Sequence, residues 1–303
     1  MTAESALEIR GVSKRFGQQV AVRNVDLTIP SGSIYGFLGP NGAGKTTTIR
    51  MVMSIIYPDT GTIRILGKPN AEGIKDRLGY LPEEKGLYKK MTALEILIYF
   101  GRLKGMNGAD AKAKAKDLLT RYGLGDAIDK KCEALSKGMG QKVQILGTTI
   151  HDPDLVILDE PFSGLDPVNA DVMRDLILQM RDEGKTVIFS THIMQQAEQL
   201  CDSILLMHRG DKIIDGTLKE VRSSGDHGIQ LDYDGDGSFL KSMEGVERVN
   251  DSGKQAEIYL EPGYDPQQIL AQIVGKVSVR RFDLREPSLH EIFVRAVGGD
   301  VDE

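Results

Sequence analysis

The chain of 303 residues has no tryptophan, few aromatic residues (6%) and only two cysteines, Cys132 and Cys201. The cysteines lack the spacing of metal ligands, so we expect reduced thiols in a cytosolic protein. An excess of basic residues is also missing, because 44 acidic side chains outnumber 38 basic ones and the net charge is −6. This balance argues against broad binding to nucleic acid, which normally requires a basic face.

Long apolar segments are absent as well. No run of about 18 apolar residues occurs, so no segment is expected to span a membrane. Residues 1–11 lack the basic and apolar regions of a signal peptide. The hydrophobic content of 40% and charged content of 27% are ordinary for a soluble globular protein, and the length allows about two domains. Any membrane role must therefore come through a partner.

Short apolar segments alternate with helical patterns through most of the chain, which is typical of an α/β protein. Two segments of alternating polarity near the N-terminus are predicted to be antiparallel strands, and later apolar runs are typical of buried parallel strands. Residues 89–147 have a mainly helical pattern. The predicted strands of this part are residues 6–16, 21–29, 33–38, 62–69, 154–160 and 186–192.

A polar, glycine-rich segment at residues 222–228 indicates a domain boundary. The sequence after it mixes short strand-like and helix-like patterns, which indicates a small α+β domain. We therefore predict a first domain over residues 1–223, with a helical subdomain at about 85–150, and a second domain over residues 224–303.

Residues 39–46 read Gly-Pro-Asn-Gly-Ala-Gly-Lys-Thr, which fits the pattern G-x-x-x-x-G-K-[ST]. Glycines let backbone N–H groups close around phosphate, Lys45 adds positive charge toward the β and γ oxygens, and the Thr46 hydroxyl can bind Mg²⁺. A predicted strand before the loop and a predicted helix after it argue against a chance glycine turn. The predicted phosphate-binding residues are Gly39, Asn41, Gly42, Gly44, Lys45, Thr46 and Thr47.

Two carboxylates end the predicted strand at residues 154–160. Asp159 can reach Mg²⁺ or its bound water, as in other phosphoryl-transfer sites. Glu160 should turn toward the nucleotide and polarise an attacking water as general base. His192 follows another apolar strand and could hydrogen-bond the γ-phosphate or that water, although a histidine in such a place is more often structural.

One apparent metal motif is rejected. Residues 232–237 resemble the start of an EF-hand loop, but position twelve would be Met243 instead of a bidentate glutamate. The preceding segment is also predicted to be a strand. The lysine-rich stretch at residues 111–117 is interpreted as the solvated face of a helix.

Six spaced motifs resemble, in their order, those of the nucleotide-binding subunits of ABC transporters. The similarity extends over about residues 6–220. It implies a RecA-like P-loop NTPase core with an antiparallel β subdomain and a helical subdomain, followed by the small C-terminal α+β domain. It also implies hydrolysis of ATP with Mg²⁺. The motifs lie at residues 39–47, 80–88, 135–143, 155–161, 163–166 and 190–192.

The resemblance assigns further residues. Phe16 would lie under the adenine, although it could instead be a core residue. Residues 135–139 read Leu-Ser-Lys-Gly-Met where the family usually has LSGGQ, so Ser136 and Gly138 are kept. Asp166 ends the D-loop, and His192 would be the switch histidine.

Glu83 occupies a position where the family usually has glutamine, and there it would contact Mg²⁺ and sense the transporter. A carboxylate is a harder ligand for the cation, but it adds negative charge near the γ-phosphate. Three segments are similar to those of a subgroup of exporter-type cassettes, which includes sodium- and drug-efflux ATPases. They are residues 80–88, the LSKGM form of the signature, and residues 286–293.

In this family two cassettes pack head to tail, and the signature helix of one chain holds the γ-phosphate bound to the P-loop of the other. The partners implied are a second copy or a paralogous cassette and a separate transmembrane permease, with no nucleic acid. The chain would then be cytoplasmic and peripheral on the inner face of the cell membrane. The sequence does not identify the transported substrate.

Two other functions are compatible with an ATP-binding cassette. Non-transport members act in DNA repair or on ribosomes, but they usually carry a long coiled-coil insertion or two cassettes. Here one set of motifs occurs, and residues 84–135 are too few for a long coiled coil. The other alternative is a regulatory ATP-binding module without turnover, against which the presence of Glu160 counts.

Overall fold

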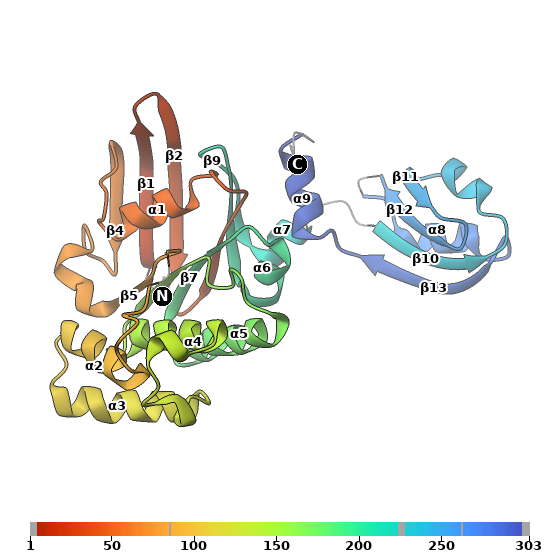
Figure 1. The fold of residues 1–303 in the computed structure, drawn as a ribbon. Coiled ribbons are helices and arrows are strands. Elements are labelled where there is room, and N and C mark those ends of the chain that lie inside the picture. Colours follow the sequence, from red (N-terminus) through yellow and green to blue (C-terminus); the bar gives the residue numbers. More distant parts are fainter. Residues whose placement is uncertain (1–4, 85, 224–227, 262, 299–303) are drawn as a thin grey trace. The chain divides into compact units, whose positions relative to one another are not determined.

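A computed structural model of the chain describes residues 5–84, 86–223, 228–261 and 263–298 (Figure 1). The chain divides into two compact units, Met1–Gly216 and Thr217–Glu303. The predicted boundary segment lies largely outside the described residues, because it includes residues 224–227. No helix in the described ranges is long and apolar enough to cross a bilayer.

The first unit contains a six-stranded sheet with the order β5-β6-β7-β3-β8-β9 (Figure 1). Strands β3, β6 and β7 are buried at every position, as expected for parallel strands covered on both faces. Leu38 pairs with Thr191 and Asp159 with Ser190, so the carboxyl ends of these strands meet at one edge. The strands are β3 (Ile34–Leu38), β5 (Leu78–Leu81), β6 (Leu155–Asp159), β7 (Thr186–Thr191), β8 (Ser203–His208) and β9 (Asp211–Thr217).

A second, antiparallel sheet has the order β2-β1-β4. Its pairing of β1 (Ser5–Phe16) with β2 (Gln19–Pro30) confirms the predicted antiparallel strands, and β4 (Thr60–Ile65) forms the other edge. Buried side chains from both sheets and from α1 (Lys45–Val52) share one hydrophobic core, which therefore fixes the loop between β3 and α1.

Three helices form the predicted helical region (Figure 1). Each begins at a polar N-cap residue whose side chain accepts a backbone N–H: Thr92, Asn107 and Ser136. The helices are α2 (Ala93–Leu103), α3 (Gly108–Arg121) and α4 (Lys137–Thr149). Two further helices of the first unit are α5 (Pro167–Asp182) and α6 (Met194–Leu200), and its short 3-10 turns are η1 (Glu72–Arg77), η2 (Gly125–Ala127) and η3 (Cys132–Ala134).

The second unit has an antiparallel sheet with the order β11-β12-β10-β13, as expected for an α+β domain. One face of this sheet packs in a separate core that includes Leu231, Tyr233 and Ile258, together with Ile269 of α8. Met243, the residue that disqualified the calcium loop, belongs to this core. The elements are α7 (Leu218–Ser223), β10 (Gly228–Asp234), η4 (Ser238–Ser242), β11 (Val246–Asp251), β12 (Gln255–Leu260), α8 (Pro266–Ile273), β13 (Ser278–Arg285) and α9 (Leu289–Ala296).

Candidate active site

The loop between β3 and α1 contains the glycines of the phosphate-binding motif. Gly39, Gly42 and Gly44 have φ angles of +142°, +78° and +107°, a region that residues with side chains rarely adopt. A Cβ at position 39 would also overlap the carbonyl oxygen of Met207. Gly44 is the N-cap of α1 and supplies no side-chain cap, and no acidic residue occupies the first turn. The start of α1 therefore has the properties of an anion-binding helix terminus.

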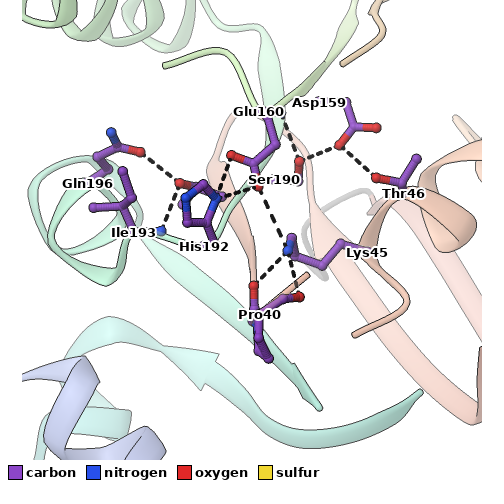
Figure 2. A network of polar contacts seen from close by, with 11 residues as sticks. Pro40, Lys45, Thr46, Asp159, Glu160, Ser190, His192, Ile193 and Gln196 are labelled. Carbon is purple, nitrogen blue, oxygen red and sulfur yellow. Dashed lines mark hydrogen bonds and ion pairs between the residues drawn. The ribbon is translucent and has the colours of Figure 1, made fainter. Parts of the chain in front are cut away.

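Lys45 opens α1 and is buried, with 5% of its surface exposed. Its Nζ donates to the carbonyl oxygens of Gly39 at 2.6 Å and Pro40 at 3.1 Å, and lies 3.8 Å from Oε1 of Glu160 (Figure 2). Burial lowers the pKa of Lys45, and the negative charges of Glu160 and Asp159 oppose this shift. The loop thus holds an ammonium group beside the two carboxylates that end β6.

Asp159 is completely buried at the end of β6. Its Oδ1 accepts hydrogen bonds from Ser190 Oγ at 2.5 Å and from Thr46 Oγ1 at 3.3 Å (Figure 2). Its Oδ2 is buried and has no hydrogen-bond partner within the described part of the chain. An unpaired carboxylate oxygen in the interior is costly, and a hard cation would satisfy it.

Thr46 and Asp159 fit Mg²⁺, because a hydroxyl and a carboxylate are oxygen ligands of the kind that this ion prefers. The described residues contain no cluster of three or more His, Cys, Asp or Glu side chains that could hold a metal ion. A cation beside Thr46 and Asp159 would therefore take most of its remaining ligands from phosphate oxygens and water, as Mg²⁺ usually does, with Glu83 as the other predicted ligand.

Glu160 has a φ angle of +48°, which is unusual for a residue with a side chain and recurs at functional sites. Its backbone N–H donates to Ser190 Oγ at 2.9 Å. The same hydroxyl donates to the carboxylate of Asp159, so Ser190 contacts both residues. Both carboxylate oxygens of Glu160 lie 3.1 Å from Nδ1 of His192 (Figure 2). The predicted base, histidine and P-loop lysine are therefore brought together.

The signature segment begins α4. Ser136 is the N-cap, and its Oγ accepts from the N–H of Met139 at 3.3 Å. Gly138 is buried, and a Cβ there would overlap the side chain of Asn169. Asp166, the predicted D-loop residue, caps α5 by accepting from the N–H of Asn169 at 3.0 Å, and this hydrogen bond lowers its pKa. No hydrogen bond joins Ser136 or Gly138 to the P-loop in the ranges that the structure describes.

Two other predicted site residues, Phe16 and Glu83, are exposed. Phe16 ends β1 and is 50% exposed, with Lys14 Nζ lying 5.7 Å from its ring centroid. This exposure excludes a core role and leaves stacking on a base as the prediction. Glu83 is exposed just after β5, and its negative charge is a small influence that opposes the lowering of the Lys45 pKa by burial. The remaining predicted loop residues are the exposed Asn41 and the half-buried Thr47.

Two polar residues of this region lie within the motifs at residues 135–143 and 190–192, but their roles were not predicted from the sequence. Ser190 lies at the end of an apolar strand, two residues before His192. Gln141 is 3% exposed, and its Nε2 donates to the carbonyl oxygen of Pro161, directly after Glu160. Its helical pattern gave no indication of this contact.

Comparisons with known proteins cover both units. The family model described as "ABC transporter" matches residues 22–163, and the model "ATP-binding protein DrrA1-3-like, C-terminal domain" matches residues 216–297. An uncharacterized ABC transporter ATP-binding protein of Bacillus subtilis, YhaQ, is 40% identical over 96% of this chain and 98% of its own length.

Two other matches extend the comparison. The Nod factor export ATP-binding protein I of Burkholderia lata is 33% identical over 98% of both chains. A solved structure of an ATP-binding subunit of an ABC transporter superposes with a TM-score of 0.66 at 32% identity, covering 72% of this chain and 92% of that one. The similarity to the two relatives therefore runs through the C-terminal unit, beyond the nucleotide motifs.

Proposed function

This chain belongs to the ATP-binding subunits of ABC transporters, a family that hydrolyses ATP, and on that premise we propose that it powers export of a substrate through a separate membrane-spanning partner. The observation that carries this function is the meeting of three groups: buried Lys45 at the start of α1, buried Glu160 after β6, and His192 after β7. A complete set of hydrolytic groups disfavours a regulatory module without turnover. The full-length similarity to a Nod factor export protein supports transport over a role on DNA or ribosomes.

The proposed chemistry assigns one task to each group. Glu160 is the general base that polarises the attacking water, and His192 holds its carboxylate and donates toward the γ-phosphate. The positive charge of Lys45 balances the negative charge of the β- and γ-phosphate oxygens. Thr46 and Asp159 hold Mg²⁺, which supplies charge neutralisation at the phosphates when bound.

The remaining predicted residues complete the nucleotide site. The phosphates bind to the N–H groups of the P-loop and of the first turn of α1, including those of Asn41 and Thr47. Phe16 stacks on the adenine. Glu83 lies near enough to influence Lys45 and is assigned to the metal shell or to the surface that senses the partner.

The signature residues act on a second copy of the cassette, or on a paralogous one. Ser136 is the N-cap of α4, and the N–H groups of the first turn of this helix bind the γ-phosphate held by the other chain, beside Asp166. The complex lies on the cytoplasmic face of the cell membrane because the membrane-spanning partner holds it there.

Mixing two inactive variants tests the shared site. Lys45→Ala removes the P-loop charge, and Ser136→Glu places a carboxylate at an exposed position where the phosphate should arrive. Each variant alone should be inactive. A mixed dimer retains one intact site, so random mixing should restore roughly a quarter of the wild-type activity if the two sites act independently.

The substitution is made at Ser136 and not at Gly138, because a side chain at position 138 would collide with Asn169 of its own chain. Crosslinking decides the case in which coupled sites suppress recovery. A photoreactive ATP analogue bound at Lys45 of one chain should label the signature segment of the other. Labelling confined to a single chain, in samples shown to be dimeric, contradicts the shared site.

The transport function is tested with the chain in its own membranes. A tagged wild-type chain should co-purify with a membrane-spanning protein, and the purified pair should hydrolyse ATP faster than the chain alone. Recovery of the chain without any membrane protein, under conditions that preserve other membrane complexes, would contradict the proposed partner.

A further inference from the structure

Gln141 lies in the second turn of α4 and is one of the few buried polar side chains of the described residues. Its Nε2 donates a hydrogen bond to the carbonyl oxygen of Pro161, which is itself buried. Pro161 directly follows Glu160, the proposed base. A buried backbone carbonyl needs a donor, so the amide of Gln141 satisfies a group that the fold could not easily leave unpaired.

The backbone around Glu160 is held from three sides. Its N–H donates to Ser190 of β7, and its carbonyl oxygen accepts from the N–H of Ser163 within the same turn at 3.2 Å. The next carbonyl, that of Pro161, is held by Gln141 of α4. A left-handed conformation at a residue with a side chain, such as Glu160, persists only when its surroundings impose it. Of these three hydrogen bonds, the one from Gln141 connects this backbone to α4.

The first turn of α4 is packed against the same segment. The ammonium end of Lys137 lies against Gly164, where a Cβ would overlap its Nζ. One residue on, Gly138 packs against the side chain of Asn169. Between Ser136 and Gln141 the helix makes about one and a half turns, which is a stiff unit at this length.

We propose that Gln141 is a positioning residue for hydrolysis: it fixes the backbone that orients Glu160 and ties the base to the helix that begins with Ser136. The proposal rests on the proposed function, in which that helix start contacts ATP on another copy. A shift of α4 then reaches the base through one hydrogen bond.

Substitutions that keep the shape of Gln141 test the positioning. Gln141→Met removes the donor and should lower kcat by roughly 10- to 100-fold, since small misplacements of a catalytic group have effects of this size. The KM for ATP should change by less than about threefold, because the P-loop contacts are untouched. Gln144→Met, on the same helix, is the matched control and should leave both parameters near wild type.

A pH profile separates a lost hydrogen bond from a general packing defect. Gln141→Glu regains a donor only when the new carboxyl is protonated, and burial raises the pKa of a carboxyl group. The ratio of its kcat to that of the wild type should therefore rise as the pH falls from 9 to about 6. The same ratio for Gln141→Met should stay flat. Wild-type kcat in Gln141→Met, or a flat ratio for Gln141→Glu, would overturn the positioning role.

The link to the helix start is tested by a double-mutant cycle on kcat. The effects of Ser136→Ala and Gln141→Met on kcat should not be additive, because both act on Glu160 through the same helix, α4. Additive effects would overturn the link. If Ser136→Ala alone has no effect, the shared site of the proposed function is contradicted, while the kcat and pH results for Gln141 still decide its role.

Discussion

The two units of this chain treat polar groups in opposite ways. All the buried polar or charged side chains of the described residues belong to the first unit. Of this set, Asp159, Glu160 and Ser190 lie at the ends of parallel strands, and Lys45 opens α1. In the second unit the charged groups pair on the surface, as Arg285 does with Glu257 at 2.8 Å. Burying charge is expensive, so its concentration in one unit marks where chemistry is done.

The surface pairs of the second unit have a different consequence. Arg248 lies 4.1 Å from the ring centroid of Tyr259, and Arg285 also reaches Glu291 of α9 at 3.3 Å. Such exposed pairs contribute little to stability. We infer that the second unit regulates or pairs the cassettes, and that only the first contacts ATP.

The sharpest test of this contrast changes one glutamate in each unit. Glu160→Gln should reduce ATP turnover by roughly 10²–10⁴-fold, because the general base is lost, while ATP binding is kept. The variant should accumulate as an ATP-bound dimer in size-exclusion chromatography. Glu257→Gln is the matched control and should stay within about twofold of wild type, as expected for an exposed pair. Near-normal turnover in Glu160→Gln would remove that residue from the mechanism.

Acidification should destabilise the first unit more than the second. Burial, with a contribution from Lys104, lowers the pKa of His151 from 6.5 to about 4. The unfolded chain therefore binds a proton near pH 6.5 that the folded chain binds only near pH 4. The stability from neutral His151 is complete above pH 6.5 and is lost as the pH falls through this window. After discounting for partial exposure, the loss is roughly 1–2 kcal/mol.

Calorimetry between pH 7 and pH 4 measures this effect. His151→Gln can still donate to the carbonyl of Leu78, which His151 contacts at 3.0 Å, and should flatten the pH dependence of the first transition. His290→Gln, at an exposed position of the second unit, should leave it unchanged. Equal slopes for wild type and His151→Gln would contradict the assignment.

Glu83 offers a smaller test at the edge of the active site. If it belongs to the metal shell, Glu83→Gln should shift the Mg²⁺ concentration for half-maximal turnover by about two- to fivefold, since one anionic ligand is replaced by a neutral one. ATP affinity should change less, because the P-loop supplies most phosphate contacts. Glu84→Gln is the neighbouring control. Metal titrations and partner stimulation that both match wild type would show the position to be neutral.

Removing the second unit should have the smallest effect on nucleotide binding. A chain ending at Gly216 keeps the whole first unit, which has its own core. Its ATP affinity should stay within about threefold of the full chain, while pairing or turnover changes. Calorimetric binding to a truncated chain with a cooperative melting transition checks this. Loss of ATP binding in such a folded chain would contradict the inference that only the first unit contacts ATP.

Much of the first unit could be predicted because its signals are local. The glycines of the P-loop, the apolar runs of β3, β6 and β7, and the polar N-caps of α2, α3 and α4 each depend on neighbours within a few residues. Strand β5 was not predicted, because Leu78–Leu81 is too short to show a period and is identified only by its pairing with β6. The exposure of Phe16 likewise depends on how β1 ends, which its sequence neighbours do not determine.

The sequence by itself determined the family, the fold class, the ATP-hydrolysing activity and the order of the motifs, since spacing and residue type along the chain are enough for those. Tertiary structure decided which groups support the proposed base. Ser190 is 30 residues from Glu160 along the chain, and Gln141 is 20 residues from Pro161. Parallel pairing of β6 with β7 brings the first pair together, and the placement of α4 brings the second. Both polar residues lie inside the spaced motifs at residues 135–143 and 190–192, but the motifs do not show which distant group each side chain contacts, because that depends on how the segments pack.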